Sequence, residues 1–176
     1  MLEEKLKAVV RDIPDFPQPG IVFKDITPIL KDASLCSEII DAFAEYVKSL
    51  DVQVIAGIES RGFLFGMMLA IKLGIPFVPI RKQGKLPAHT IAESYKLEYG
   101  QATIEIHEDA FTPGTKVLIH DDLLATGGTV VAAAKLIEKL GGEVAGFSFV
   151  INLQFLKGEG RLHRFSTNVI SLVDYV

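Results

Sequence analysis

Disulfide chemistry is almost excluded in this chain, because its 176 residues include only one cysteine, Cys36. A single cysteine cannot form an internal disulfide, and it also argues against a structural zinc cluster. No apolar run is long and unbroken enough to span a membrane. The N-terminal segment MLEEKLKAVV is charged and amphipathic, unlike a secretory leader. These features predict a soluble protein of a reducing compartment, the cytoplasm.

The sequence also contains no low-complexity tract, no internal repeat and no excess of positive charge. Its net charge is −4, which argues against a general nucleic-acid binder. Hydrophobic residues make up 49% of the chain and the mean hydropathy is +0.33, so we expect a globular protein. The length suits one domain with a sizeable core. We therefore predict a single domain, residues 1–176, with no nucleic-acid or membrane partner.

Strand-like and helix-like segments alternate along most of the chain. Apolar residues recur at helical spacing in residues 2–10, 34–50, 62–73 and 129–140. Apolar or alternating runs predict strands in residues 52–58, 75–80, 95–107 (two strands), 116–120, 144–151 and 168–173. Ser34 is the expected cap of the second helix, and residues 13–23 and 81–92 are expected to be loops. The alternation predicts an α/β fold with a doubly wound, mostly parallel sheet flanked by helices.

The segment from Val117 to Thr129, VLIHDDLLATGGT, carries the most specific pattern in the chain. An apolar strand leads into two adjacent acids, Asp121 and Asp122, and a small polar turn precedes the next helix. The turn consists of Ala125, Thr126, Gly127, Gly128 and Thr129. Glycines let the backbone approach an anion, and the N–H groups and dipole of a helix start favour a phosphate there. Since nearby carboxylates suit ligand hydroxyls, the motif predicts a ribose 5-phosphate site.

Other readings of this segment fit less well. An ordinary strand-to-helix turn would account for the glycines, but not for two acids, because buried carboxylates are costly unless they are paired or functional. The Gly-Lys-Ser/Thr of a P-loop and the Gly-x-Gly-x-x-Gly of a dinucleotide site are both missing from the sequence. Successive side chains of a strand point to opposite faces, so we expect only one of Asp121 and Asp122 to contact the ribose hydroxyls well.

Two further loops, each after a predicted strand, carry cationic side chains. Ligands of doubly wound sheets bind beyond the carboxyl ends of the strands, so both loops are expected at the site. The sequence Glu59-Ser60-Arg61-Gly62 places an arginine at a helix start, where its guanidinium can grip a diphosphate. Arg81, Lys82 and Lys85 form a cationic loop that could close over a leaving group. The alternatives are a surface arginine and a solvated basic loop.

Together these patterns resemble the phosphoribosyl-diphosphate site of the type I phosphoribosyltransferases. The matching segments cover almost the whole chain in the family's order and are similar to its adenine-specific branch: FPQPGIVFKDITPIL, ESRGFLFG, IRKQGKLP, SYKLEYG and VLIHDDLLATGGT. The resemblance implies the type I phosphoribosyltransferase fold, with a small N-terminal hood over the base site (residues 1–33) on a core of residues 34–176. It implies a purine-salvage enzyme that transfers the 5-phosphoribosyl group of 5-phosphoribosyl 1-diphosphate to adenine, giving AMP and pyrophosphate.

The resemblance also implies residue roles. The implied catalytic residues are the acid/base Glu98 and the cations Arg61, Lys82 and Lys85. The implied ribose and 5-phosphate ligands are Asp121, Asp122, Ala125, Thr126, Gly127, Gly128 and Thr129. The implied pyrophosphate ligands are Glu59, Ser60, Arg61, Arg81, Lys82 and Lys85, with a cis peptide between the first two. The implied adenine ligands are Val22, Phe23, Lys24 and Leu123.

The same resemblance implies a magnesium cofactor and a homodimer. Mg²⁺ would be held mainly by the diphosphate and the ribose hydroxyls. Two departures are conservative: Glu59 and Lys24 stand where some relatives have Asp and Arg. The alternatives are a hypoxanthine, guanine or xanthine transferase, or a non-catalytic regulator that senses the sugar diphosphate. A regulator would need a DNA-binding extension, for which this chain has no spare residues.

Overall fold

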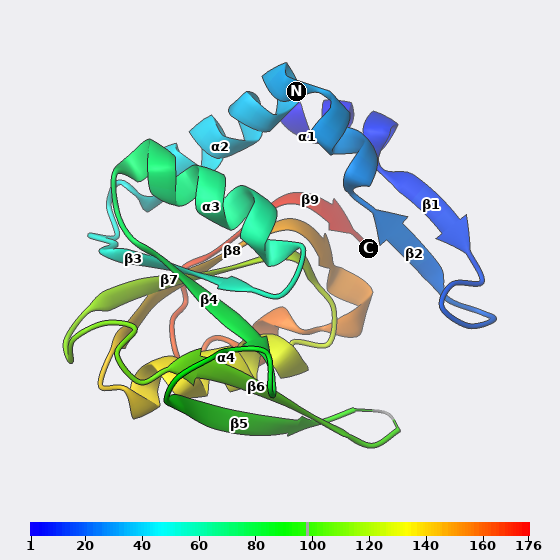
Figure 1. The fold of residues 1–176 in the computed structure, drawn as a ribbon. Coiled ribbons are helices and arrows are strands. Elements are labelled where there is room, and N and C mark those ends of the chain that lie inside the picture. The colour runs from blue at the N-terminus through cyan, green and yellow to red at the C-terminus, as the bar shows by residue number, and fades with distance from the viewer. Residues whose placement is uncertain (98) are drawn as a thin grey trace.

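The computed structural model describes residues 1–97 and 99–176, and within these ranges it contains one large sheet. Figure 1 shows this sheet running through the centre of the molecule. Its order is β5-β6-β4-β3-β7-β8-β9, and its members are β3 (Val54–Ile58), β4 (Phe77–Lys82), β5 (Thr90–Lys96), β6 (Gln101–His107), β7 (Lys116–Leu124), β8 (Glu143–Leu153) and β9 (Val169–Tyr175). The strands pair in parallel except where β6 meets β4 and β5. The predicted doubly wound, mostly parallel α/β sheet is confirmed.

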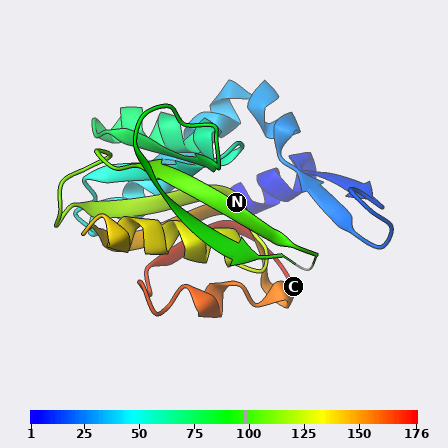
Figure 2. The same ribbon diagram turned by 60° about the horizontal axis from the view of Figure 1, so that its bottom comes forward.

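Helices cover both faces of the sheet (Figures 1 and 2). The helices α1 (Leu2–Val9), α2 (Ala33–Val47) and α3 (Gly62–Leu73) lie on one face, and α4 (Gly128–Lys139) lies on the other. Two apolar clusters result, because alternate residues of a strand point to opposite faces. In β7, for example, Leu118 packs in the cluster with α2 and α3, whereas Val117 and Ile119 pack in the cluster with α4. None of the described helices is long and apolar enough to cross a membrane.

The first residues after α1 form a small hairpin that projects from the body of the molecule (Figure 1). Its antiparallel strands are β1 (Arg11–Pro14) and β2 (Val22–Asp25). Lys24 holds the hairpin in place: its Nζ lies 2.6 Å from a carboxylate oxygen of Asp12 and 4.0 Å from the ring centre of Tyr175 at the end of β9. A 3-10 helix η1 (Thr27–Lys31) leads from the hairpin to α2.

Three local expectations were wrong. The helix α2 is capped by Asp32, whose side chain accepts a hydrogen bond of 3.0 Å from the Leu35 N–H, and not by Ser34. Residues 13–23 are not all loop, since both ends of this segment belong to strands of the hairpin. The strands can form because the prolines lie at the bend or at the end of a strand, where no backbone N–H is needed for pairing. Residues 81–92 are less of a loop than expected, since β4 continues to Lys82 by pairing with β6 and β5 already begins at Thr90.

His120 is fully buried in β7 beneath the predicted site. Its Nδ1 lies 2.8 Å from the Ser148 hydroxyl, and its ring packs edge-on against Phe43. Burial away from water lowers the pKa of His120 to about 4, and the nearby charge of Asp122 opposes this shift only in part. The imidazole is therefore neutral in the folded protein at neutral pH.

His120 should make the free energy of unfolding depend on pH. Below pH 6.5 the histidine takes up a proton in the unfolded chain but not in the folded one, so stability falls until the pH reaches about 4. The pKa difference corresponds to roughly 3 kcal/mol. His120→Asn keeps a polar atom near Ser148 but does not titrate, so its unfolding free energy should fall less over this range. Urea titrations of both proteins at pH 7 and pH 5 measure the difference, and equal losses would contradict the assignment.

Candidate active site

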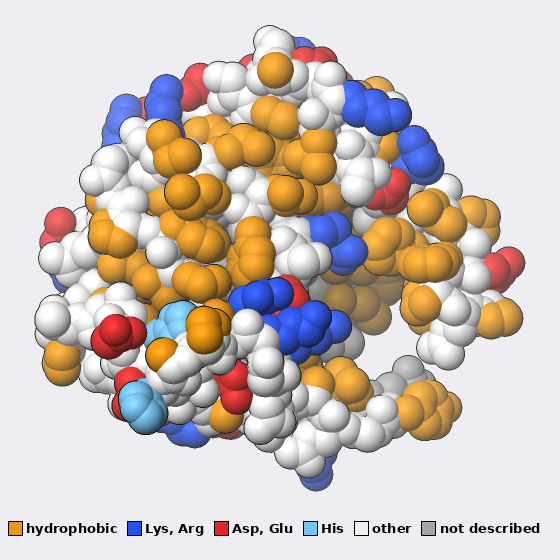
Figure 3. Space-filling model, viewed as in Figure 1, with side chains coloured by type: hydrophobic (Ala, Val, Ile, Leu, Met, Phe, Trp, Pro, Cys, Tyr) orange, Lys and Arg blue, Asp and Glu red, His pale blue; other side chains and the backbone are white. Residues whose placement is uncertain are grey.

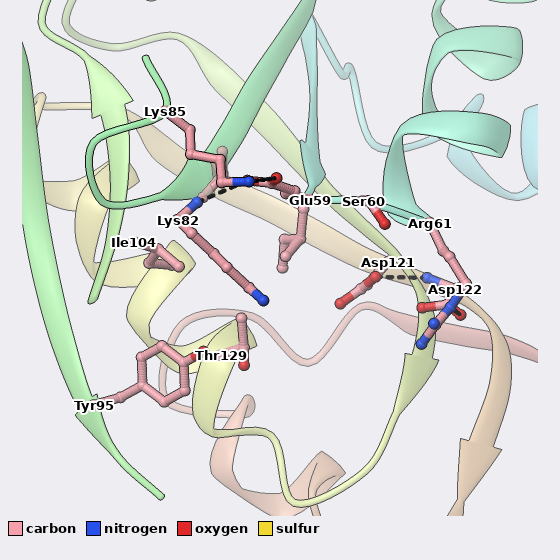
Figure 4. Close-up of a pocket in the computed structure, with 12 residues that line it drawn as sticks. Glu59, Ser60, Arg61, Lys82, Lys85, Tyr95, Ile104, Asp121, Asp122 and Thr129 are labelled. Atoms are coloured by element: carbon pink, nitrogen blue, oxygen red, sulfur yellow. Dashed lines mark hydrogen bonds and ion pairs between the residues drawn. The ribbon is translucent and has the colours of Figure 1, made fainter. Parts of the chain in front are cut away.

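A cavity of about 320 Å³ lies where the carboxyl ends of β3, β4 and β7 meet the start of α4. Figure 4 shows the side chains that converge there from these elements and from β5 and β6. Its lining residues are Ile58, Glu59, Ser60, Arg61, Ile80, Lys82, Lys85, Tyr95, Ile104, Asp121, Asp122 and Thr129. The three loops that the sequence indicated therefore do surround one cavity.

The two acids lie within β7 and point in different directions, as predicted from strand geometry. Asp122 is buried, and its carboxylate lies 2.5 Å from Nε of Arg61. Asp121 points into the cavity, and its Oδ1 accepts a hydrogen bond of 2.8 Å from the Asp122 N–H (Figure 4). Burial and the adjacent charge of Asp122 raise the pKa of Asp121 well above its ordinary value. Among the described residues Asp121 forms no ion pair, and it is the acid that faces the cavity.

Arg61 connects the core of the site to the N-terminal hairpin. Its Nε contacts Asp122, and the centre of its guanidinium lies 5.1 Å from the ring centre of Phe23 in β2. Such stacking of a guanidinium on an aromatic ring is favourable, because the face of the ring carries partial negative charge. Arg61 therefore touches the hairpin and the acid pair together, on the side of the cavity opposite Lys85 (Figure 4).

Glu59 organises the cationic loop on the other side of the cavity. Its carboxylate accepts hydrogen bonds from the Arg81 guanidinium (3.1 Å) and from the Lys82 N–H (2.9 Å), and it lies 3.8 Å from Nζ of Lys85. Burial tends to raise the pKa of Glu59, but these hydrogen bonds and charges outweigh it and lower the pKa below its ordinary value. The side chain of Lys82 reaches into the cavity and faces Asp121 (Figure 4). The Glu59–Ser60 peptide is cis, as expected.

The predicted phosphate turn forms the N-terminus of α4. Gly127 adopts a left-handed conformation (φ 80°) as the residue before the helix, and no side chain caps the helix start. A second, smaller cavity of about 90 Å³ lies against this turn, with the lining residues Asp121, Leu123, Ala125, Thr126, Gly127, Gly128, Thr129 and Val130. Because Asp121 and Thr129 line both cavities, the phosphate turn and the larger cavity adjoin one another.

The residues implied for adenine are spread over two elements. Phe23 faces Arg61, whereas the ammonium group of Lys24 is held by Asp12 and Tyr175 and the side chain of Val22 is half exposed. Among the described residues that line the 320 Å³ cavity, none comes from the hairpin, and Leu123 lines the smaller cavity. Among the described residues, the contact between Phe23 and Arg61 joins the hairpin to the site.

Glu98 lies outside the described residues. Tyr95, which the sequence reasoning did not single out, lines the larger cavity, and its ring lies against Gly128 of the phosphate turn. The alternation in β5 could have indicated Tyr95, because it lies two residues after Glu93 and therefore on the same face of the strand. Glu93 forms ion pairs with Lys135 and Lys139 of α4. That face of β5 therefore packs on α4, and Tyr95 follows it towards the site.

Figure 3 shows lysine and arginine side chains gathered beside a hollow between the sheet and the hairpin, with an acidic side chain among them. Such an arrangement suits a polyanionic ligand that also carries hydroxyl groups. The described residues contain no cluster of three or more histidine, cysteine, aspartate or glutamate side chains that could hold a metal ion. Of the carboxylates that line this cavity, Asp122 is paired with Arg61 and Glu59 with Arg81, which fits a cation bound mainly through the ligand.

Comparison with known proteins defines the class first. The family model described as phosphoribosyl transferase domain matches residues 26–170. The fold also agrees with a crystal structure of adenine phosphoribosyltransferase from Thermoanaerobacter pseudethanolicus, with a TM-score of 0.95 and 50% sequence identity over 99% of this chain and 100% of that one. With its phosphate turn, acid pair and cationic loop, the chain is a phosphoribosyltransferase.

The particular branch follows from the curated relatives. The adenine phosphoribosyltransferase of Cytophaga hutchinsonii is 52% identical over 175 residues, which cover 99% of this chain and 97% of that protein. The Saccharomyces cerevisiae enzyme, solved with adenine and an imino-altritol bisphosphate, is 40% identical with a TM-score of 0.91 and covers 97% of this chain and 98% of that one. The chain belongs to the adenine phosphoribosyltransferase family, enzymes of purine salvage.

Proposed function

We propose that this chain transfers the 5-phosphoribosyl group from 5-phosphoribosyl 1-diphosphate to adenine and releases AMP and pyrophosphate. The observation that carries the proposal is a pair of adjoining cavities that share Asp121 and Thr129, one lined by the phosphate turn and the other by Lys82. A ribose 5-phosphate with a diphosphate on C1 presents matching groups: a monoester, vicinal hydroxyls and a polyanion. The Trypanosoma brucei relative, solved with AMP, pyrophosphate and ribose 5-phosphate, is consistent with these ligands.

The sugar phosphate would bind by the groups that the site offers. The 5-phosphate would accept hydrogen bonds from the backbone N–H groups of residues 125–129 at the start of α4. Asp121 would accept hydrogen bonds from the ribose hydroxyls, because Asp122 is already engaged by Arg61. Mg²⁺ bound to the diphosphate and ribose oxygens would neutralise negative charge when present. Ser60 and Arg81, with Glu59, would complete the diphosphate side of the site.

The transfer step follows from these positions. The N9 atom of adenine forms a bond to C1 of the ribose as the bond from C1 to the pyrophosphate oxygen breaks, with inversion at C1. The leaving group departs as a polyanion, so fixed cations beside it lower the barrier. Lys82 lies in the cavity, and Lys85 is held close by through Glu59. Glu98 is the proposed acceptor of the proton that N9 loses.

The base would bind beneath the hairpin, which we propose as the hood. Phe23 would supply an apolar wall, with its ring supported by the guanidinium of Arg61. The backbone near Val22 would read the adenine amino edge, with Lys24 and Leu123 nearby. The Giardia lamblia relative was solved with 9-deazaadenine, which supports a purine site in this fold.

We also propose a cytoplasmic homodimer. An apolar groove of about 470 Å³ between α2 and α3 gives a surface for a second copy, with Met68 and the exposed Ile71 in its lining. Hydrophobic side chains over α2 and α3 are prominent in Figure 3. Exposed apolar patches of this kind are typical of interfaces.

The purine specificity can be tested in one assay. Adenine, hypoxanthine and guanine are each incubated with 5-phosphoribosyl 1-diphosphate and Mg²⁺, and nucleotide formation is followed spectrophotometrically. We expect AMP from adenine and kcat/KM at least about a hundredfold lower for the two oxopurines, because a site that pairs the amino edge leaves buried groups unpaired with them. Faster reaction of hypoxanthine or guanine would assign the chain to the other purine transferases. Binding without turnover of any base would favour the sensing regulator.

A further inference from the structure

A segment outside the recognised motifs lies directly against the phosphate turn. It begins after β8 and contains two short 3-10 helices, η2 (Gln154–Leu156) and η3 (Glu159–Arg161). Figure 2 shows this segment on the same face of the sheet as α4. Nothing in the sequence pattern of this segment suggested a ligand.

The backbones of the segment and the turn are in direct contact. A Cβ added to Gly158 would lie 2.2 Å from the carbonyl oxygen of Ala125 and 3.0 Å from the amide nitrogen of Gly127. A Cβ added to Gly127 would in turn lie 2.9 Å from the carbonyl oxygen of Gly158. Glycine is therefore needed on both sides of this contact, and a displacement of either backbone would be transmitted to the other.

Arg161 adds a specific bond to this contact. Its Nη1 donates a hydrogen bond of 2.9 Å to the carbonyl oxygen of Thr126. The C=O and N–H of a trans peptide point in opposite directions, so this bond also fixes the direction of the Gly127 N–H. The same nitrogen lies 3.9 Å from the position of a Cβ on Gly128, so the charge sits beside the helix start.

The segment is itself anchored to the core. Leu162 is fully buried in the cluster that contains α4. Glu159 accepts a hydrogen bond of 3.3 Å from Asn152 in β8, at the position that pairs with Leu124 of β7. Arg161 is consequently held at a fixed place, although its side chain is exposed to solvent.

We propose that Arg161 is a positioning residue for the 5-phosphate of the sugar diphosphate. It acts through the phosphate turn: it fixes the Thr126–Gly127 peptide and adds positive charge beside the N-terminus of α4. The inference rests on the proposed function for the identity of the ligand. It predicts that loss of Arg161 weakens binding of the phosphorylated sugar and leaves the adenine side of the site unaffected.

The test compares Arg161→Met, Arg161→Lys and the wild type in the full chain. Isothermal titration with ribose 5-phosphate gives Kd, steady-state assays give KM for each substrate and kcat, and thermal melts give Tm. For Arg161→Met we expect Kd for ribose 5-phosphate and KM for the sugar diphosphate to rise about tenfold, with KM for adenine, kcat and Tm unchanged. Arg161→Lys, which keeps charge and a donor, should bind within about threefold of the wild type.

Arg164→Met is the matched control, since Arg164 is also exposed but its guanidinium stacks on Phe165, 4.5 Å from the ring centre. It should bind ribose 5-phosphate as the wild type does. Unchanged affinity in Arg161→Met, an equal loss in Arg164→Met, or a parallel rise of both KM values with a lower Tm would overturn the proposal. A wild type that binds ribose 5-phosphate but does not convert adenine would refute the proposed function alone, because the titrations still decide the role of Arg161.

Discussion

Replacing Asp121 with asparagine should weaken binding of 5-phosphoribosyl 1-diphosphate by about a hundredfold. The variant loses a charged acceptor for the ribose hydroxyls, and hydrogen bonds to charged groups are stronger than those to neutral ones. The same variant should be at least as stable as the wild type. The raised pKa of Asp121 means that burial and the charge of Asp122 make its ionised form less favourable in the folded protein than in the unfolded chain, and a neutral amide removes that cost. The asparagine oxygen can still accept the Asp122 N–H. Calorimetric titration and thermal melts at pH 7.5 measure the two effects.

Asp122→Asn is the matched comparison, because it makes the same replacement of a carboxylate by an amide at the neighbouring residue. Asp122 is buried against Arg61, which is itself partly exposed, so this variant should lose about 1–2 kcal/mol of stability. The two variants should therefore move Tm in opposite directions or by clearly different amounts. Native affinity for the sugar diphosphate in Asp121→Asn would remove that residue from the ribose site. Equal destabilisation in both variants would contradict the different environments assigned to them.

The second large effect is expected at Glu98. Glu98→Gln keeps the size of the side chain but cannot take a proton, so kcat should fall by a factor of about 10² to 10⁴. The KM and Kd for the sugar diphosphate should change little, because the proposed role concerns the proton on adenine N9. Steady-state kinetics and titration with ribose 5-phosphate separate the two quantities.

Glu108→Gln is a suitable control, because Glu108 is an exposed carboxylate just after β6 that lines neither cavity. It should leave kcat unchanged. A Glu98→Gln enzyme with wild-type turnover would rule out the acid/base assignment. A loss of sugar-diphosphate affinity as large as the loss of kcat would point to a binding role for this residue instead.

The sequence predicted the sheet well because its central strands are continuous apolar runs. Every residue of β3 is buried, and a strand covered on both faces leaves no ambiguity in its pattern. The hairpin β1–β2 was missed because its strands are only four residues long and the bend between them contains two prolines. Its register depends on tertiary contacts such as the one between Lys24 and Tyr175, which lie 151 positions apart in the chain and leave no local signal.

The sequence predicted which loops form the site, but not which side chains pair with one another there. The acid pair, the phosphate turn and the basic loop converge on one cavity as their strand-end positions indicated. Composition could not show that Arg61 pairs with Asp122 while Glu59 holds Arg81, because each pairing depends on side-chain direction between different strands. Arg161 was not visible either, since its target is a backbone carbonyl, which has no sequence signature.

The contacts of Arg61 have a consequence for how the two substrates influence one another. One guanidinium touches both the acid of the ribose side and the aromatic ring of the hairpin. A ligand that changes the ion pair between Asp122 and Arg61 therefore also changes the contact between Arg61 and the Phe23 ring. By thermodynamic linkage, if bound sugar diphosphate changes the affinity for adenine by some factor, bound adenine changes the affinity for the sugar diphosphate by the same factor. Arg61 thus gives this coupling a direct route between the two halves of the site.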